Sequence, residues 1–406
     1  MDITRTSPAM SKISQVETDL VAAATALIPV LRSRSAQTAK IAKMPDATTH
    51  DLQAAGLFDL MVPKMYGGLQ TSARTLMDVI IELAKGDGSV AWNVCLLAGG
   101  TWMAATLYPK SVGDIVFAPG SNSRVANSFS LRNARTRRVE GGLLIEDGLW
   151  SFNSGVHNAA WDVLVTPVMT DTGEVVDRVC ALVATSDLIL LNDWNTTGLR
   201  GSGSMSVAIN NLFVPEERLI PFSKWLKEDY GATHLRKEPL YRMPMVALML
   251  SRLACPALGM AKAALELFLE KAPHRSIAFT PYDKQNEAVV THLQVAEASM
   301  KIDMAELLLH RAIDALDSGA AIGRPFSVAE RLRIRRDTAY ANRLVWEAMD
   351  GLAGASGGSF ASVENGMNQI WQDVRVASLH GGLNPSTAFE LFGRVMCGME
   401  PNVPLI

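Results

Sequence analysis

The spacing of hydrophobic and polar residues differs along the chain and divides it into three stretches. Within residues 17–108 apolar side chains recur every three or four positions, as in SARTLMDVIIELAKG (72–86) and HDLQAAGLFDL (50–60). This period predicts amphipathic helices. Thr48 or Thr49 is the expected N-cap of the helix in 50–60, because a hydroxyl just before an apolar run can accept from a free backbone N–H.

From residue 119 onward the helical period fades, and Gly, Ser and Asn become frequent. Short runs rich in β-branched and aromatic residues take over: RVANSFS (124–130), GGLLIEDGLWSF (141–152), WDVLVTPVMT (161–170), RVCALVATS (178–186) and SVAINNLFVP (206–215). Turn-forming segments such as EGG and DTGE separate them. This pattern predicts an antiparallel β unit.

Beyond residue 240 long helical patterns return, over 247–271, 284–318, 327–349 and 365–379. In 284–318 the apolar stripe consists of Leu293, Ala296, Met300, Met304 and Leu307, and Gly319 is the expected end of that helix. Ser327 and Glu330 have the spacing of a capping box. Helices with apolar stripes and short loops are most simply buried as a four-helix bundle.

The order of elements predicts an α+β protein that is mainly α. We expect an N-terminal helical domain over residues 1–118, a middle antiparallel β domain over 119–222 and a C-terminal four-helix bundle over 223–406. No internal repeat or low-complexity linker separates these units, so we expect them to pack together.

Composition narrows the class of protein. With 48% hydrophobic and 19% charged residues, the 406-residue chain is an ordinary folded globule. Its net charge of −3 provides no basic field for nucleic acid, and we expect its apolar runs to be too short to cross a membrane. The four cysteines are far apart in sequence and the first 15 residues are polar, so we expect buried thiols, no secretory signal and a cytoplasmic location. Seven scattered histidines predict no metal site.

Two segments at the edges of the β unit carry candidate chemistry. The first, GLWSFNSGVHNAAW (148–161), surrounds Ser154 with aromatic residues, and the second, DWNTTGLRGSGSMSVAINNLFVPEERLI (193–220), joins Trp194 to a Gly/Ser-rich run. Exposed backbone N–H groups and an aromatic cover suit a flat ligand. Composition alone also allows a plain strand and turn for the first segment and a glycine-rich β-turn for the second.

At this point the chain resembles a known family. PKMYGG (63–68), then GLRGSGSMSVAINNLFVPEERLI (198–220), then a helical C-terminal half, are similar in kind and order to the acyl-CoA dehydrogenase superfamily. The likeness runs from about residue 17 to 400. It implies an acyl-CoA dehydrogenase-like fold, a flavin between the last two domains and a homotetramer.

One position argues against a simple dehydrogenase. Many such enzymes have RD followed by YEGT near the C-terminus, and the glutamate is the base. Here these positions are Gln372-Asp373 and His380 to Leu383, and the glutamate position is Gly381, which cannot take a proton.

Three further matches resemble the two-component flavin-dependent monooxygenase branch of the same superfamily. They are GDGSVAWNV (86–94), GLWSFNSG (148–155) and the histidine-containing tail RVASLHGGLNPSTAFELFGRVMCGMEP (375–401). The resemblance implies an oxygenase that receives reduced flavin, FADH2 or FMNH2, from a separate NAD(P)H:flavin reductase. With O2 it would hydroxylate a phenol- or indole-like aromatic or heteroaromatic molecule through a flavin C4a-hydroperoxide.

The resemblance also assigns roles to individual residues. His380 and Ser154 become the expected catalytic residues, with Ser154 at the flavin N5 and His380 either a base or a hydrogen-bond donor to the peroxide. The expected flavin-binding residues are Asn127, Phe152, Ser154, Trp194 and Arg275, the last toward the flavin phosphate of a neighbouring subunit. Trp92 and His157 are expected at the substrate pocket, His157 more as a structural neighbour.

A purely structural role remains possible on sequence grounds for two of these residues: His380 as a helix C-cap and Arg275 as an ordinary surface arginine. Two rival functions also remain open on sequence grounds. One is an acyl-CoA dehydrogenase-type flavoenzyme with its base elsewhere, and the other is a non-catalytic scaffold of the same fold.

Overall fold

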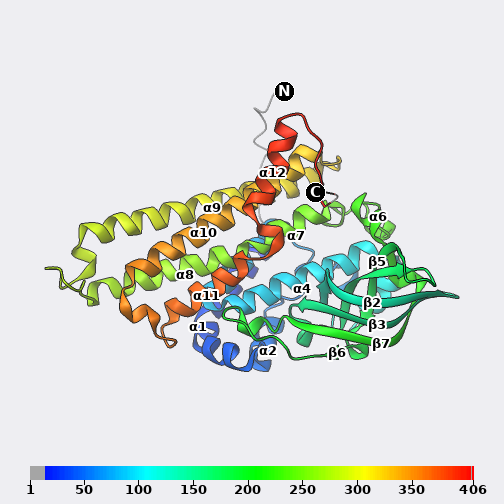
Figure 1. Ribbon diagram of the computed structural model, residues 1–406, viewed down its shortest axis with the longest axis horizontal. Coiled ribbons are helices and arrows are strands. Elements are labelled where there is room, and N and C mark those ends of the chain that lie inside the picture. The colour runs from blue at the N-terminus through cyan, green and yellow to red at the C-terminus, as the bar shows by residue number, and fades with distance from the viewer. Residues whose placement is uncertain (1–13, 404) are drawn as a thin grey trace.

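The computed structural model describes residues 14–403 and 405–406, and it has three regions in chain order (Figure 1). The N-terminal helices are α1 (Gln15–Ile41), α2 (Asp46–Ala54), α3 (Ala73–Gly86), α4 (Gly88–Leu107) and α5 (Lys110–Val116). All strands of the described chain follow within 125–221, and helices dominate from there on. The expected acyl-CoA dehydrogenase-like fold is confirmed. The boundaries at 118/119 and 222/223 stay predictions, and most of the polar N-terminal stretch lies outside the described residues.

The N-terminal caps differ partly from expectation. Helix α1 opens with a capping box in which Ser14 and Glu17 satisfy each other's backbone N–H groups. The prediction of Thr48 or Thr49 as a cap was wrong, since α2 begins at Asp46 directly after Pro45 and has no side-chain cap. Pro45 itself stands at the N-cap position, in an extended conformation.

Two four-stranded sheets form the middle region. The strands are β1 (Val125–Ser128), β2 (Ser130–Val139), β3 (Gly142–Asn153), β4 (Trp161–Met169), β5 (Val175–Ala184), β6 (Ile189–Leu190), β7 (Met205–Pro215) and β8 (Leu219–Pro221). One sheet has the order β1-β4-β5-β8 and the other β2-β3-β7-β6. The antiparallel prediction fails at one pair: β1 and β4 run parallel, because the β2–β3 hairpin between them belongs to the other sheet.

The C-terminal region consists of α6 (Phe222–Leu226), α7 (Met245–Leu253), α8 (Cys255–Lys271), α9 (Val289–Ile322), α10 (Val328–Ala355), α11 (Gly366–Ser378) and α12 (Pro385–Met396). The single helix expected over 247–271 is broken at Ala254, because Pro256 stands in the first turn of α8. Helix α9 passes through Gly319 and ends before Gly323, whose left-handed φ of 77° forms the cap. The capping box of Ser327 and Glu330 is confirmed.

Helix α4 is the central element of the fold. All of its residues are buried, and it lies against α3, α8 and β1. Gly88–Leu107 and Met245–His274 are apolar and long enough for a membrane span, although no such run was expected from the sequence. Both are largely buried within the folded chain, which is what core helices require. Among the cysteines, Cys397 is exposed rather than buried as expected.

The apolar stripe of α9 does not face the bundle core, contrary to expectation. Leu293 and Leu307 are 67% and 69% exposed, and Met300 and Met304 are exposed with them. A second set of residues, including Ala298, Ile302, Ala305 and Leu309, packs inward. Helix α9 therefore has two apolar faces, and one of them is uncovered in the single chain.

Candidate active site

Three of the residues singled out in the sequence meet at the start of α4. Asp87 caps this helix by accepting from the N–H groups of Ser89 and Val90, and Trp92 follows one turn later. The Trp92 indole N–H donates to Ser154 Oγ at 3.1 Å. The indole also lies 6.2 Å from the His380 imidazole, centroid to centroid. Elements far apart in the chain thus bring Trp92, Ser154 and His380 together.

Phe152 is held in an unusual conformation at the end of β3. The register of β3 and β7 shifts between Trp150 and Asn153, and Phe152 adopts a left-handed φ of 58° and is 57% exposed. Such backbone conformations are costly for a non-glycine residue and concentrate at ligand sites. The ring meets Trp194 edge-on at a centroid distance of 6.1 Å. The two rings offer an aromatic surface to a ligand.

A row of hydroxyl groups runs inward from Ser154. Ser154 Oγ lies 2.6 Å from Ser204 Oγ, which lies 2.7 Å from Ser202 Oγ. Ser202 Oγ in turn donates to the carbonyl oxygen of Leu199 at 2.7 Å. The Gly/Ser-rich segment therefore contributes buried side-chain hydroxyls to the site.

The same segment is fastened to α11. The Leu199 backbone N–H donates to the Asp373 carboxylate at 2.6 Å, and a side chain at Gly198 would collide with the Gln372 carbonyl. Burial raises the pKa of Asp373 to about 8, and the charge of Asp87 also raises it. Sequence reasoning did not assign a role to Asp373. Its only signal was its place in the RD position of the family.

His380 follows α11 and begins the 3-10 helix Gly381–Leu383. Its Nδ1 accepts from the backbone N–H of Gly382 at 3.1 Å, so the neutral ring carries its hydrogen on Nε2. Desolvation, and then the charge of Arg252, lower the pKa of His380 to about 4. His380 is exposed in the single chain although protein surrounds much of the ring.

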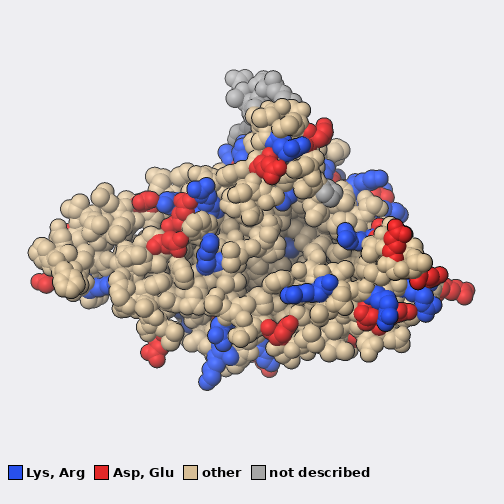
Figure 2. Space-filling model, in the orientation of Figure 1, with Lys and Arg blue, Asp and Glu red and all other residues tan. Residues whose placement is uncertain are grey.

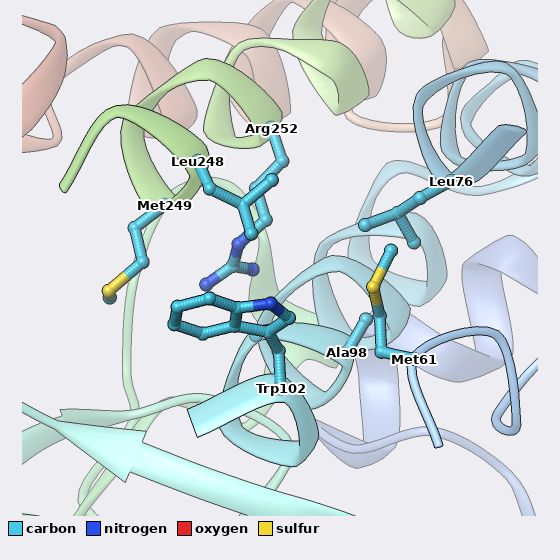
Figure 3. A pocket seen from close by; sticks show the side chains of 8 residues that line it. Met61, Leu76, Ala98, Trp102, Leu248, Met249 and Arg252 are labelled. Atoms are coloured by element: carbon cyan, nitrogen blue, oxygen red, sulfur yellow. The ribbon is translucent and has the colours of Figure 1, made fainter. Parts of the chain in front are cut away.

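Arg252 is a second residue that sequence reasoning missed. It lies on α7, buried, and donates to the Cys95 carbonyl oxygen on α4. Its Nε and Nη2 have no partner among the described residues, which is costly for a buried cation. Figure 3 shows the guanidinium above the Trp102 ring in an apolar pocket with Met61, Leu76, Ala98, Leu248 and Met249. A lone arginine in the apolar run LMLSRLACPALG was the available signal.

The remaining predicted residues lie at different places. Asn127 is buried on β1, and its side-chain amide donates to the Leu96 carbonyl on α4 at 3.1 Å. His157 lies near Gly203, and desolvation and then the charge of Lys43 lower its pKa.

Arg275 follows α8 and lines a small separate pocket with Lys271, Ser356 and Asn365. None of the residues that line this pocket belongs to the cluster around Ser154. The predicted contact of Arg275 was with the flavin of a neighbouring subunit, and that contact stays a prediction.

The donor set fits a reduced flavin. Phe152 and Trp194 form an aromatic surface, and Ser154 and His380 provide polar groups beside it. When bound, reduced flavin supplies the electrons that activate O2. Over 14–403 and 405–406 we find no group of three or more His, Cys, Asp or Glu side chains able to hold a metal ion.

Known proteins share this fold and sequence. The N-terminal domain of acyl-CoA dehydrogenases matches residues 21–108 and the C-terminal domain matches 251–385. The structure of XiaF from Streptomyces sp., in complex with FADH2 and glycerol, is 31% identical with a TM-score of 0.90 and covers 96% of this chain and 98% of its own.

Two relatives carry names that state an activity. The oxygenase subunit HsaA of a flavin-dependent monooxygenase from Rhodococcus jostii (strain RHA1) is 28% identical over 91% of this chain and 95% of its own. The oxygenase component of an FADH(2)-dependent resorcinol hydroxylase from Rhizobium sp. (strain MTP-10005) is 26% identical over 94% and 95%.

The chain belongs to the acyl-CoA dehydrogenase superfamily. Within it, the chain belongs to the two-component flavin-dependent monooxygenases and is an oxidoreductase that works with reduced flavin and O2. The resemblance read from the motifs is thus confirmed. The individual site residues stay predictions.

Proposed function

We propose that the protein is the oxygenase component that hydroxylates a phenol-type aromatic substrate by way of a flavin C4a-hydroperoxide. The observation that carries the proposal is the meeting of Trp92, Ser154 and His380 beside the exposed ring of Phe152. FADH2 is the preferred cofactor, since XiaF is described with FADH2 and the resorcinol hydroxylase is named for it.

His380 acts as a hydrogen-bond donor rather than as a base. Its Nδ1 lone pair is used by the Gly382 N–H, and with a pKa of about 4 the ring is neutral at working pH. The free group is therefore Nε2–H, which donates to an oxygen but cannot remove a proton. One positioned donor of this kind is typically worth ~10²–10³ in rate.

Arg252 favours a substrate that carries an oxygen acceptor. A buried guanidinium with unpaired N–H groups binds a phenolic or phenolate oxygen well, whereas an indole N–H offers it no acceptor. Its positive charge also contributes to the lowered pKa of His380. The site therefore suits phenol-like better than indole-like substrates.

The aromatic and amide groups hold the cofactor and the substrate. Phe152 and Trp194 pack against the flavin ring, Asn127 lies at its pyrimidine edge and Ser154 faces N5. Trp92 forms a wall of the substrate pocket. His157 supports the loop beside the site without touching the reacting atoms.

The partners follow from the two-component class. A separate NAD(P)H:flavin reductase in the cytoplasm supplies the reduced flavin, with no nucleic acid or membrane involved. Basic and acidic side chains are interspersed over the face shown in Figure 2, which agrees with a small-molecule enzyme.

Self-association is the further part of the proposal. We propose a homotetramer in which the uncovered stripe of α9, with Leu293 and Leu307, is buried between subunits. In this assembly Arg275 reaches the flavin phosphate of a neighbouring chain.

The experiment that tests the function is stopped-flow mixing of the protein and anaerobically reduced FAD with oxygenated buffer. A transient absorbance distinct from oxidised flavin, followed by hydroxylation of phenol but not of its methyl ether, is expected. Immediate reappearance of oxidised flavin, with bleaching of bound oxidised flavin by an acyl-CoA, would refute the proposal in favour of a dehydrogenase.

A further inference from the structure

The hydroxyl row from Ser154 to Leu199 has a fixed direction. A serine hydroxyl has one hydrogen to donate and two lone pairs that accept. Because the Leu199 carbonyl can only accept, the hydrogen of Ser202 Oγ is committed to it. Ser202 is therefore an acceptor in its contact with Ser204.

The direction passes along the row one step at a time. Ser204 must donate to Ser202, so its own hydrogen is used there. In the 2.6 Å contact between Ser204 and Ser154, Ser154 must then be the donor. All three hydrogens point along the row toward the Leu199 carbonyl.

Ser154 is left with a single free function. Its hydrogen is committed to Ser204, and one lone pair receives the indole N–H of Trp92 at 3.1 Å. Among the residues of the described chain, nothing occupies the second lone pair. Ser154 Oγ therefore offers a ligand an acceptor and no donor.

The two oxidation states of flavin differ at N5 in whether this atom donates or accepts a hydrogen bond. Reduced flavin carries a hydrogen on N5, whereas oxidised flavin has a lone pair there. We propose that the serine row Ser202–Ser204–Ser154 holds Ser154 as an acceptor toward N5 and thereby selects reduced over oxidised flavin. This inference rests on the proposed placement of Ser154 at N5, and it makes Ser202 and Ser204 specificity-determining positioning residues.

The inner end of the row is firmly anchored. The Leu199 carbonyl accepts from the Trp194 indole N–H at 2.9 Å as well as from Ser202, and the Leu199 N–H is bound by Asp373. Leu199 has a left-handed φ of 49°, so its orientation is enforced by these contacts. The direction of the hydrogen bonds in the row is thus set by the Leu199 carbonyl, whose position does not depend on any one of the three serines.

The test compares affinities for the two oxidation states. Dissociation constants for FADH2, measured anaerobically, and for oxidised FAD are determined for the wild-type protein, Ser202→Ala and Ser204→Ala. Either substitution frees the hydroxyl hydrogen of Ser154 to turn toward N5. We expect the preference for reduced flavin to fall roughly tenfold, the worth of one hydrogen bond, mainly because oxidised FAD binds more tightly.

Ser206→Ala is the matched control. Ser206 is a buried serine of β7, two residues after Ser204, but its hydroxyl pairs with Ser151 outside the row, so its loss should leave the ratio unchanged. An unchanged ratio in both Ser202→Ala and Ser204→Ala overturns the inference, as does an equal fall in the control. Weaker binding of both flavin forms by one factor also overturns it. The oxygen transient of the wild-type protein reports the proposed function separately.

Discussion

The hydrogen bond from the Leu199 N–H to the buried Asp373 carboxylate leads us to expect a pH-dependent effect of Asp373 on stability. Asp373→Asn keeps an oxygen that accepts from the Leu199 N–H but removes a buried carboxylate. The folded state holds the Asp373 proton far more tightly than the unfolded chain, because burial raises the pKa from 3.8 to about 8. The substitution is therefore expected to stabilise the protein at neutral and alkaline pH.

The sign and size follow from proton linkage. A carboxyl group with a raised folded pKa contributes its full stability below pH 3.8 and loses it as the pH rises to about 8. The gap between these two values corresponds to a ceiling of ~6 kcal/mol above pH 8. Asn titrates nowhere in this range, so the advantage of the variant over the wild-type protein should grow from pH 4 to 8 and then stay level.

Urea unfolding at pH 5, 6, 7, 8 and 9, at one protein concentration, measures this difference directly. Asp303→Asn, an exposed carboxylate on α9, is the control and should show no such growth. The reasoning is refuted when the free-energy difference for Asp373→Asn is independent of pH, or when the variant is less stable than the wild-type protein at pH 8.

Three further predictions concern the site and the assembly. His380→Ala should lower the rate of product formation ~10²–10³-fold, whereas His380→Gln, which keeps an N–H donor, should retain part of it. With a His380 pKa of about 4, the wild-type rate should show no histidine titration between pH 6 and 8, and a step there would contradict the donor role. Leu293→Glu combined with Leu307→Glu should yield a smaller species in light scattering with unchanged helix content, while the exposed loop variant Val363→Glu should not.

Sequence reasoning reached the class of protein because its motifs record local chemistry. The period of three to four in α3 and α10 predicts helices wherever the helices finally pack. The capping box at Ser327 depends only on a four-residue spacing. The histidine-containing tail and the Gly/Ser-rich segment could likewise be recognised from their consecutive residues alone.

Predictions from the sequence failed where the same apolar pattern can face either the core of the chain or another subunit. The stripe of Leu293 and Leu307 has the same period whether it faces a core or another subunit, so its exposure was not predictable. The predicted end of α9 was also wrong. Gly319 lies inside the helix and packs against Phe326, whereas Gly323 forms the C-cap with a left-handed φ.

The sequence by itself determined the helices, the strands and the superfamily, because these follow from spacing, capping and turn residues that act over a few positions. Only the tertiary structure decided that Trp92, Ser154 and His380 meet. It alone revealed the direction of the serine row. A hydrogen bond depends on where each donor and acceptor lies in space, and residues more than 200 positions apart become neighbours only when the chain folds.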